Sequence, residues 1–349
     1  MTTADILADW YRQHRRPLPW RETRDPYLVW VSETILQQTR VAQGLEYYQR
    51  FVARFPDVTA LAAAPEDEVL KYWQGLGYYT RARNLLAAAR DIVDRRGGVF
   101  PDTHAGVRSL KGVGDYTAAA ICSFALGVPR AVVDGNVYRV LARLHGVEMA
   151  ADTGEGRRYF AALAAELLPT RSHDVHNQAI MEFGALQCVP RSPDCPVCPL
   201  ADRCVALATR RVDALPVKKA KPTLKHRYFN YLHVTGNGMT LLAKREERDI
   251  WRNLHEFPVI ETDRPVEFDE LCLHPRFREL LSGATLARVE INVMSRRHLL
   301  THRVIHARFH RLDVSEFSPA MRVYLLVPDA DLDSYAVHRL VQGYLEERQ

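Results

Sequence analysis

The chain has 349 residues, of which 47% are hydrophobic and 26% are charged, a composition typical of folded globular proteins and unlike that of disordered ones. Its 47 basic and 42 acidic residues leave a net charge of +5, which by itself does not indicate nucleic-acid binding. No run of about 18 apolar residues occurs, so no membrane span is expected. The N-terminal pattern predicts an amphipathic helix and not a signal peptide. Six cysteines, four of them crowded together, do not suggest a secreted disulfide framework, which favours a cytoplasmic protein.

Helical periodicity dominates the first 207 residues. Apolar residues recur at helical spacing over 41–55, and further helices are expected over 65–73 and 82–93, the last closed by Gly97-Gly98 and Pro101. No alternating segment interrupts this part. We therefore predict an all-α domain over residues 1–207.

A glycine-rich turn between two helices is the most informative local motif. The segment LKGVGDYTAAA at 110–120 places Lys111, Gly112 and Gly114 before a helix of small residues, and glycine permits positive φ. The first N–H groups of that helix have no intrahelical partner, so the turn can hold a phosphate. Asp134 follows, directly before GNVYRVLAR, where a helix cap is the default structural interpretation and would keep the carboxylate ionised.

Four cysteines form the next cluster. Cys188, Cys195, Cys198 and Cys204 have the spacing C-x6-C-x2-C-x5-C, which one soft metal centre could satisfy. Zinc ribbons usually contain two CxxC pairs, and only one is present here. An iron–sulfur cube with four cysteine ligands is favoured, and zinc remains the alternative.

The character of the chain changes after residue 207. Residues 208–227 are strongly basic, as expected of a solvated linker or of a segment that follows phosphates. Strand-like runs at 229–234 and 239–243 flank Gly236-Asn237-Gly238, a strong hairpin signal. Further strands are expected at 286–293 and 323–327 and a helix at 336–347. We predict a small α/β domain over residues 228–349.

Taken together and in this order, the motifs resemble the helix-hairpin-helix DNA glycosylases with a 4Fe–4S loop, the endonuclease III superfamily. Within it the chain resembles adenine DNA glycosylases of the MutY type, through the segments LPWR at 18–21, SETILQQTRV at 32–41, GLGYYTRARN at 75–84, VVDGNVYRVLAR at 132–143 and NQAIMEFGALQC at 177–188. The C-terminal third is similar, more loosely, to that family's Nudix-like lesion-sensing domain. It contains no glycine- and glutamate-rich Nudix box, so pyrophosphate hydrolysis is not expected.

The resemblance implies a monomeric base-excision enzyme that acts on double-stranded DNA, is associated with the nucleoid and has no membrane contact. Its substrate would be an A:8-oxoguanine or A:G mispair, and the adenine would be flipped out before its N-glycosidic bond is hydrolysed. The implied catalytic residues are Glu33, Asp134 and Tyr116. Glu33 lies in an apolar helical run that would raise its pKa, which suits a general acid. Asp134 would stabilise an oxocarbenium-like sugar.

Tyr116 stands where bifunctional relatives have a lysine that attacks the sugar, and a tyrosine cannot form a Schiff base. The resemblance therefore implies a monofunctional enzyme, although a packed aromatic is the purely structural interpretation of Tyr116. A bifunctional glycosylase and lyase acting on oxidised pyrimidines is the alternative enzyme. A DNA-binding protein without catalytic activity is the alternative of another class.

The remaining implied roles concern binding. Trp20, Arg21 and Gln178 would surround the adenine, since a glutamine amide can pair with it through two hydrogen bonds. The residues implied to contact DNA are Gln38, Thr39, Tyr78, Lys111, Gly112 and Gly114. Tyr78 is preferred to its neighbour Tyr79 as the wedge that enters the disrupted base stack. Leu300, Thr301 and His302 align with a Phe-Ser-His triplet that reads 8-oxoguanine, so this chain keeps a hydroxyl and a histidine and lacks the aromatic ring.

Overall fold

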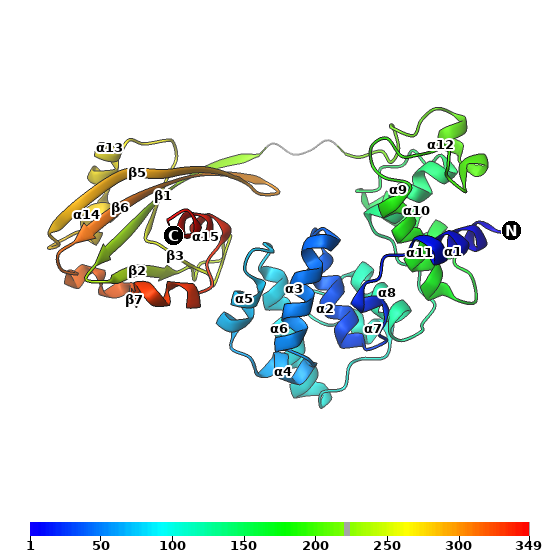
Figure 1. Ribbon diagram of the computed structural model, residues 1–349, viewed down its shortest axis with the longest axis horizontal. Helices are drawn as coiled ribbons and strands as arrows, with labels where there is room; N and C mark the ends of the chain where they lie inside the picture. Colours follow the sequence, from blue (N-terminus) through cyan, green and yellow to red (C-terminus); the bar gives the residue numbers. More distant parts are fainter. Residues whose placement is uncertain (220–223, 349) are drawn as a thin grey trace. The chain divides into compact units, whose positions relative to one another are not determined.

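Contacts between residues divide the chain of the computed structural model into two compact units. The first comprises Met1–Ala63 and Asn84–Ala220, and the second comprises Ala64–Arg83 and Lys221–Gln349. The structure describes residues 1–219 and 224–348 (Figure 1). Residues 220–223, in the predicted linker, and Gln349, at the end of the predicted second domain, lie outside the described residues.

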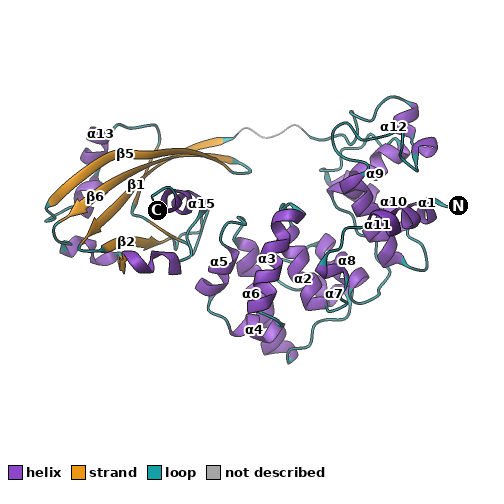
Figure 2. Cartoon of the chain, viewed as in Figure 1, coloured by secondary structure: helices purple, strands orange, loops and turns teal. Residues whose placement is uncertain are grey.

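The first unit is built from helices (Figure 2). In chain order they are α1 (Thr3–His14), α2 (Pro26–Leu36), α3 (Val41–Arg54), α4 (Val58–Ala63), α6 (Thr80–Arg96), α7 (His104–Arg108), α8 (Asp115–Phe124), α9 (Gly135–His145), α10 (Gly154–Glu166), α11 (His173–Leu186) and α12 (Val205–Ala208). Two 3-10 turns lie at Pro19–Arg21 and Ala201–Arg203. Helix α6 begins four residues before the boundary between the units. The predicted helices at 41–55 and 82–93 are confirmed as α3 and α6.

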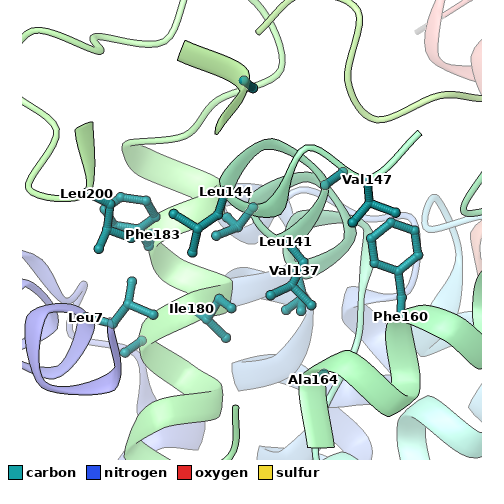
Figure 3. Close-up of a cluster of buried hydrophobic side chains, with 14 of the residues drawn as sticks. Leu7, Val137, Leu141, Leu144, Val147, Phe160, Ala164, Ile180, Phe183 and Leu200 are labelled. Carbon is teal, nitrogen blue, oxygen red and sulfur yellow. The ribbon is translucent and has the colours of Figure 1, made fainter. Parts of the chain in front are cut away.

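One core of this unit packs α9 against α11, with α1, α10 and α12 around them. Figure 3 shows side chains from these helices meeting, among them Leu7, Leu141, Phe160 and Phe183. Gly184 lets the backbones of α11 and α9 approach closely, since a Cβ atom there would lie 2.7 Å from Cβ of Asn136. The packing of α11 on α9 therefore depends on this glycine.

The predicted glycine turn joins α7 to α8. Gly112 has φ of +81°, and a Cβ atom on it would lie 2.6 Å from Cβ of Asn84, so both its conformation and its surroundings require glycine. Gly114 is different, because it is the N-cap of α8 with φ of −88° and open space around it. No side chain caps α8, which leaves its first N–H groups available as predicted.

The second unit contains a mixed sheet, seven-stranded within the described residues. Its strands are β1 (Lys225–Gly236), β2 (Met239–Lys244), β3 (His255–Glu256), β4 (Val259–Thr262), β5 (Leu286–Leu299), β6 (Arg303–Val314) and β7 (Leu325–Pro328). The main order is β3-β2-β1-β6-β5, with β4 paired to β1 and β7 to β2. β1 and β6 run parallel, pairing Lys225 with Arg303 through Thr235 with Asp313.

The predicted hairpin at 229–243 is confirmed, since β1 and β2 pair across a turn in which Asn237 and Gly238 have positive φ. The strand expected over 286–293 is the first half of β5, and the one expected over 323–327 begins two residues later, as β7. β6 was missed although it lies in the middle of the sheet. Its sequence RVIHARFHRLDV mixes arginines and histidines with apolar residues, which concealed its alternation.

Each face of the sheet has its own core. On one face α15 (Arg339–Glu346) packs Leu340, Val341 and Tyr344 against apolar residues of β1 and β6. On the other face α13 (Phe268–Leu273) and α14 (Pro275–Leu280) cover a second apolar cluster. The predicted closing helix at 336–347 is confirmed as α15, three residues shorter at its start.

The contacts differ from the predicted domain boundaries in two places. α5 (Glu66–Trp73) and the turn after it belong with the sheet, because the Gln74 side chain accepts a hydrogen bond from Val337 N at 3.2 Å and Lys244 pairs with Asp67 at 2.8 Å. The start of the predicted linker belongs to the helical unit, where Leu215 is 2% exposed and packs on the α9–α11 core. Local composition did not reveal either contact.

None of the helices in the described part of the chain combines the length and apolar character needed to cross a membrane.

Candidate active site

A cavity of about 180 Å³ in the first unit gathers all the predicted catalytic and adenine-binding residues. Its walls come from the 3-10 turn at Pro19–Arg21, from α2, α8 and α11, and from the start of α9. Among the lining residues are seven of those predicted: Trp20, Arg21, Glu33, Thr39, Tyr116, Asp134 and Gln178. The chain brings them together from segments up to 158 positions apart (20 to 178).

Glu33 is a buried carboxyl of this cavity, with only 5% of its surface exposed. It lies on α2, whose residues from Val29 to Ile35 are all buried. Burial raises the pKa of Glu33 from 4.5 to about 7, while a hydrogen bond from Tyr116 lowers it and the neighbouring Asp134 raises it further. A group with this pKa is partly protonated at neutral pH, as the apolar sequence around it predicted.

Tyr116, in the first turn of α8, is the direct partner of Glu33. Its hydroxyl donates to Oε2 of Glu33 at 2.6 Å. Burial, together with the two nearby carboxyl groups, holds the pKa of Tyr116 well above 10, so the phenol keeps its proton. The tyrosine is therefore a hydrogen-bond donor inside the cavity and not only a packed ring.

Asp134 caps α9 as predicted. Its Oδ1 accepts from the backbone N–H groups of Asn136 and Val137 at 2.9 and 2.8 Å, and Oδ2 accepts from the Asn136 amide at 2.7 Å. Each of these bonds favours the ionised carboxylate, as expected of a cap. Burial outweighs the three hydrogen bonds and raises the pKa of Asp134 above its ordinary value.

Arg21 is bound to a glutamate that the sequence analysis missed. Glu182 on α11 is 1% exposed and accepts from Arg21 at 3.0 and 2.8 Å and from Arg16 at 2.8 Å. Burial alone would raise the pKa of Glu182, but the hydrogen bonds from Arg16 and Arg21 outweigh it and hold the pKa at about 2. Glu182 thus fixes the guanidinium of Arg21 in the cavity wall through a salt bridge that it shares with Arg16.

Two other predicted adenine contacts have defined neighbours. The amide oxygen of Gln178 accepts from the hydroxyl of Tyr11 at 2.6 Å, an interaction that fixes the amide and orients its NH₂ group. Trp20 is 8% exposed and packs edge-on against Tyr48 at a centroid distance of 5.2 Å. Nothing along the chain indicated Tyr11, whereas Glu182 lies in an apolar helical run, the signal that predicted the burial of Glu33.

The predicted DNA contacts of the first unit lie on loops. Lys111 is exposed in the glycine turn before α8. Gln38 and Thr39 follow α2, and Gln38 has φ of +60°, which few residues other than glycine adopt. Thr39 lines the cavity and Gln38 does not.

The four cysteines occupy a loop held by two buried arginines of α9. Arg139 donates to the carbonyl of Cys188 at 2.7 Å, and Arg143 donates to the carbonyl of Val189 at 2.7 Å. Arg143 Nη1 also lies 3.4 Å from Sγ of Cys188. These arginines, four positions apart on one helix, are functional residues that the sequence analysis overlooked.

The cysteine thiols are close enough to affect one another. Burial raises the pKa of Cys198 to about 11, and the thiols of Cys188, Cys195 and Cys204 raise it further, while a hydrogen bond from the Leu200 N–H lowers it. The described residues include no group of three or more His, Cys, Asp or Glu side chains compact enough for a single metal ion. The backbone donor and the nearby guanidinium are both suited to thiolates, the form that binds metals.

A second cavity, of about 520 Å³, lies in the second unit and contains the remaining predicted residues. We name it the loop cavity; it is lined by residues 75–80, 249–251 and 298–303 with Arg83 and Arg339. Leu300, Thr301 and His302 form the turn between β5 and β6. The hydroxyl groups of Tyr78 and Thr301 are 3.0 Å apart. The structure thus brings the predicted wedge and the predicted lesion-reading triplet to one cavity.

Comparison with known proteins identifies the family. Adenine DNA glycosylase of Buchnera aphidicola subsp. Acyrthosiphon pisum is 32% identical to this chain over 256 residues, covering 73% of each protein. The chain belongs to the adenine DNA glycosylase family. The rat member of this family is 42% identical over 60% of this chain and 43% of its own length.

Family models match two separate parts of the chain. The model of the HhH-GPD superfamily base excision DNA repair proteins matches residues 31–166, and that of the NUDIX domain matches residues 230–347. The solved structure of a thermostable thymine-DNA glycosylase covers 59% of this chain at 29% identity, with a TM-score of 0.55. A trapped endonuclease III–DNA complex shares the fold at 24% identity and a TM-score of 0.53. The predicted helix-hairpin-helix and Nudix-like fold is confirmed.

Replacing Glu182 by glutamine should destabilise the protein, because two guanidinium groups would lose their buried anion. We expect a loss of about 3 kcal/mol in the free energy of unfolding near pH 7. The pKa of Glu182 is about 2 when folded and 4.5 unfolded, so this stabilisation is present above pH 4.5 and is lost as the pH falls through 2. Urea midpoints of the two proteins should therefore converge at low pH.

Glu148→Gln is the matched control. Glu148 pairs with Arg211 at the surface, where both side chains are exposed to solvent, and its loss should change the midpoint little. Equal midpoints for Glu182→Gln and the unmodified protein near pH 7 would contradict the prediction.

Proposed function

We propose that this chain excises adenine paired with 8-oxoguanine or guanine in double-stranded DNA by hydrolysing its N-glycosidic bond. The observation that carries the proposal is the pair formed by Glu33 and Tyr116 in a cavity shared with Asp134. One carboxyl is available as a proton donor near neutral pH, and a second lies close enough to influence it. Membership of the adenine DNA glycosylase family supports the choice of base.

The proposed reaction begins with adenine flipped out of the duplex, because its glycosidic bond is inaccessible within the stack. Glu33 transfers its proton to N7 of adenine, which turns a poor leaving group into a neutral one. The C1′–N9 bond then breaks with both electrons on the base, and the sugar becomes an oxocarbenium ion. Water adds to C1′, and its proton passes to the Glu33 carboxylate, which restores the starting state.

Asp134 is proposed to stabilise the sugar cation. Its carboxyl is fixed at the start of α9 by three hydrogen bonds, so the negative charge is held in one place. Burial raises its pKa, and a positive charge developing nearby would favour its ionised form. The attraction is therefore strongest when the sugar is most positive, which is the requirement for transition-state stabilisation.

The adenine is proposed to lie between Trp20 and Gln178. The Tyr11 hydroxyl already occupies one acceptor site on Gln178, and the amide NH₂ is the group left to donate to the base. Arg21 is tied to Glu182, so we assign it to the wall that shapes the pocket. Two-point pairing by Gln178 would require its oxygen to be shared with Tyr11.

The cavity favours base removal without strand cleavage. No lysine is found among the described residues that line it, and Tyr116 cannot form a Schiff base with the sugar. Lys111 lies in the glycine turn, and we propose that it binds a phosphate with the N–H groups at Gly112 and Gly114. The bifunctional alternative lacks an amine nucleophile at the cavity.

We further propose that Gln38, Thr39 and Tyr78 enter the disrupted duplex, and that Leu300, Thr301 and His302 read the base opposite the adenine. The contact between the hydroxyl groups of Tyr78 and Thr301 supports a shared role in one cavity. Arg83, Arg303 and Arg339 at the same cavity suit a polyanion. The protein is proposed to act as a monomer in the cytoplasm.

We propose a 4Fe–4S cluster on Cys188, Cys195, Cys198 and Cys204. The four thiols would hold it as thiolates: they lie close enough to raise the pKa of Cys198, and a guanidinium nitrogen of Arg143 lies 3.4 Å from Sγ of Cys188. The cluster would supply a structural crosslink between the loop and α9.

A 5′-labelled duplex with A opposite 8-oxoguanine tests the reaction. We expect cleavage of the adenine strand only after alkali treatment, since hydrolysis leaves an abasic site with an intact backbone. Glu33→Gln should bind this duplex and produce no abasic sites. Cleavage without alkali would indicate a lyase, and no cleavage by the unmodified protein would indicate a binding protein.

The pH dependence of base excision follows from the state of Glu33. Its pKa is about 7, so the single-turnover rate should fall as the pH rises above 7, by up to about tenfold per pH unit. Tyr116→Phe removes the hydrogen bond that lowers this pKa, so the fall should move to higher pH. Tyr159→Phe, at an exposed tyrosine, is the control and should leave the profile unchanged. A shift of the Tyr116→Phe profile to lower pH would contradict the assignment.

Absorption spectroscopy and metal analysis test the cofactor. The purified protein should be brown and contain about four irons per chain. Cys198→Ser should lose visible absorbance and iron, while Cys272→Ser, at a cysteine of the second unit, should lose neither. A colourless protein with one zinc per chain would contradict the proposal.

A further inference from the structure

Three tyrosine and tryptophan side chains line the loop cavity: Tyr78, Tyr79 and Trp251. Tyr78 is the predicted wedge and Tyr79 is buried, whereas Trp251, in the loop that follows β2, has no assigned role. The triplet at 300–302 lacks the large aromatic ring of a phenylalanine, because leucine occupies its first position. Stacking on an aromatic side chain is a common way for a protein to hold a base outside the duplex.

Tyr78 and Trp251 both have backbone dihedral angles that are unusual for bulky residues. Tyr78 has φ of +48° and Trp251 has φ of +58°, a left-handed conformation that bulky side chains rarely adopt. Such strain persists only where the surrounding structure imposes it, and it is concentrated at functional sites. Trp251 therefore shares with the predicted wedge both its cavity and its strained conformation.

One face of the Trp251 indole packs against a buried histidine. It stacks on the His338 ring with a centroid distance of 4.0 Å and an angle of 14° between the planes. His338 Nε2 lies 3.1 Å from Oε2 of Glu256, and Glu256 is paired in turn with Arg245 at 2.6 Å. All of these groups except the indole are largely or completely buried, so the ring is fixed before any ligand arrives.

We propose that Trp251 supplies the aromatic surface against which the base opposite adenine is read, in place of the ring that position 300 lacks. The proposal rests on the proposed function of the loop cavity as the 8-oxoguanine site. The indole would provide stacking, and Thr301 and His302 would provide polar contacts to the oxidised edge of the purine. Trp251 is thus a specificity-determining residue.

The test compares binding of two duplexes by full-length protein carrying Glu33→Gln, which blocks base release. The preference is the Kd for A:G divided by the Kd for A:8-oxoguanine. Adding Trp251→Leu should lower this preference about tenfold, because in the proposal only the base whose oxidised edge is held by Thr301 and His302 lies against the indole, and losing one stacked aromatic typically costs this much affinity. Trp251→Phe should retain most of the preference, because it keeps a ring.

Tyr335→Leu is the matched control. Tyr335 packs against the same apolar cluster as Trp251 and does not line the loop cavity, so its loss should leave the preference intact. An unchanged preference in Trp251→Leu would overturn the proposal, as would an equal loss in Trp251→Phe or in Tyr335→Leu. Those outcomes leave adenine excision itself untouched.

Tryptophan fluorescence provides a second measurement that does not require the leucine variant to fold. Binding of the A:8-oxoguanine duplex should quench emission of the Glu33→Gln protein, and Trp251→Phe should reduce that quenching, leaving the part contributed by Trp20 beside the adenine. Identical quenching in both proteins would overturn the proposal. If the Glu33→Gln protein showed no preference for 8-oxoguanine, the proposed mispair would fail and the role of Trp251 with it.

Discussion

Two buried arginines of α9 hold together the parts of the first unit on which its site depends. Arg139 donates to the carbonyls of Gly184 and Cys188, and so joins α9 to the end of α11 and to the cysteine loop. Arg143 donates to the carbonyls of Val189 and Pro190 in the loop, and of Val212 and Leu215 further along the chain. Buried guanidinium groups need these partners, because an unpaired buried charge is very costly.

The same helix connects this anchor to the chemistry. Asp134 lies at the N-terminus of α9, while α11 contributes Gln178 and Glu182 to the cavity. The relative position of α9 and α11 therefore determines where the carboxylates and the amide meet.

The pKa values of two glutamates in the cavity are shifted in opposite directions. Glu33 is buried with one neutral donor, and its pKa rises to about 7. Glu182 is buried with two guanidinium groups, and its pKa falls to about 2. When two similar groups lie in environments that shift their pKa values in opposite directions, one can act as a proton donor while the other stays ionised. One site can therefore hold both.

The sequence by itself determined the features that depend on near neighbours along the chain. Helical periodicity predicted α3 and α6, the turn residues predicted the β1–β2 hairpin, and Asp134 was recognised as a cap from the residues after it. Apolar neighbours on the same helix predicted the burial of Glu33, while its catalytic role was implied by the family resemblance. Only the tertiary structure decided which groups pair, since Tyr116 and Glu33 are 83 positions apart and Arg21 and Glu182 are 161. It also decided that residues 64–83 belong with the sheet and that Trp251 faces the loop cavity, because long-range packing leaves no periodic signal in the sequence.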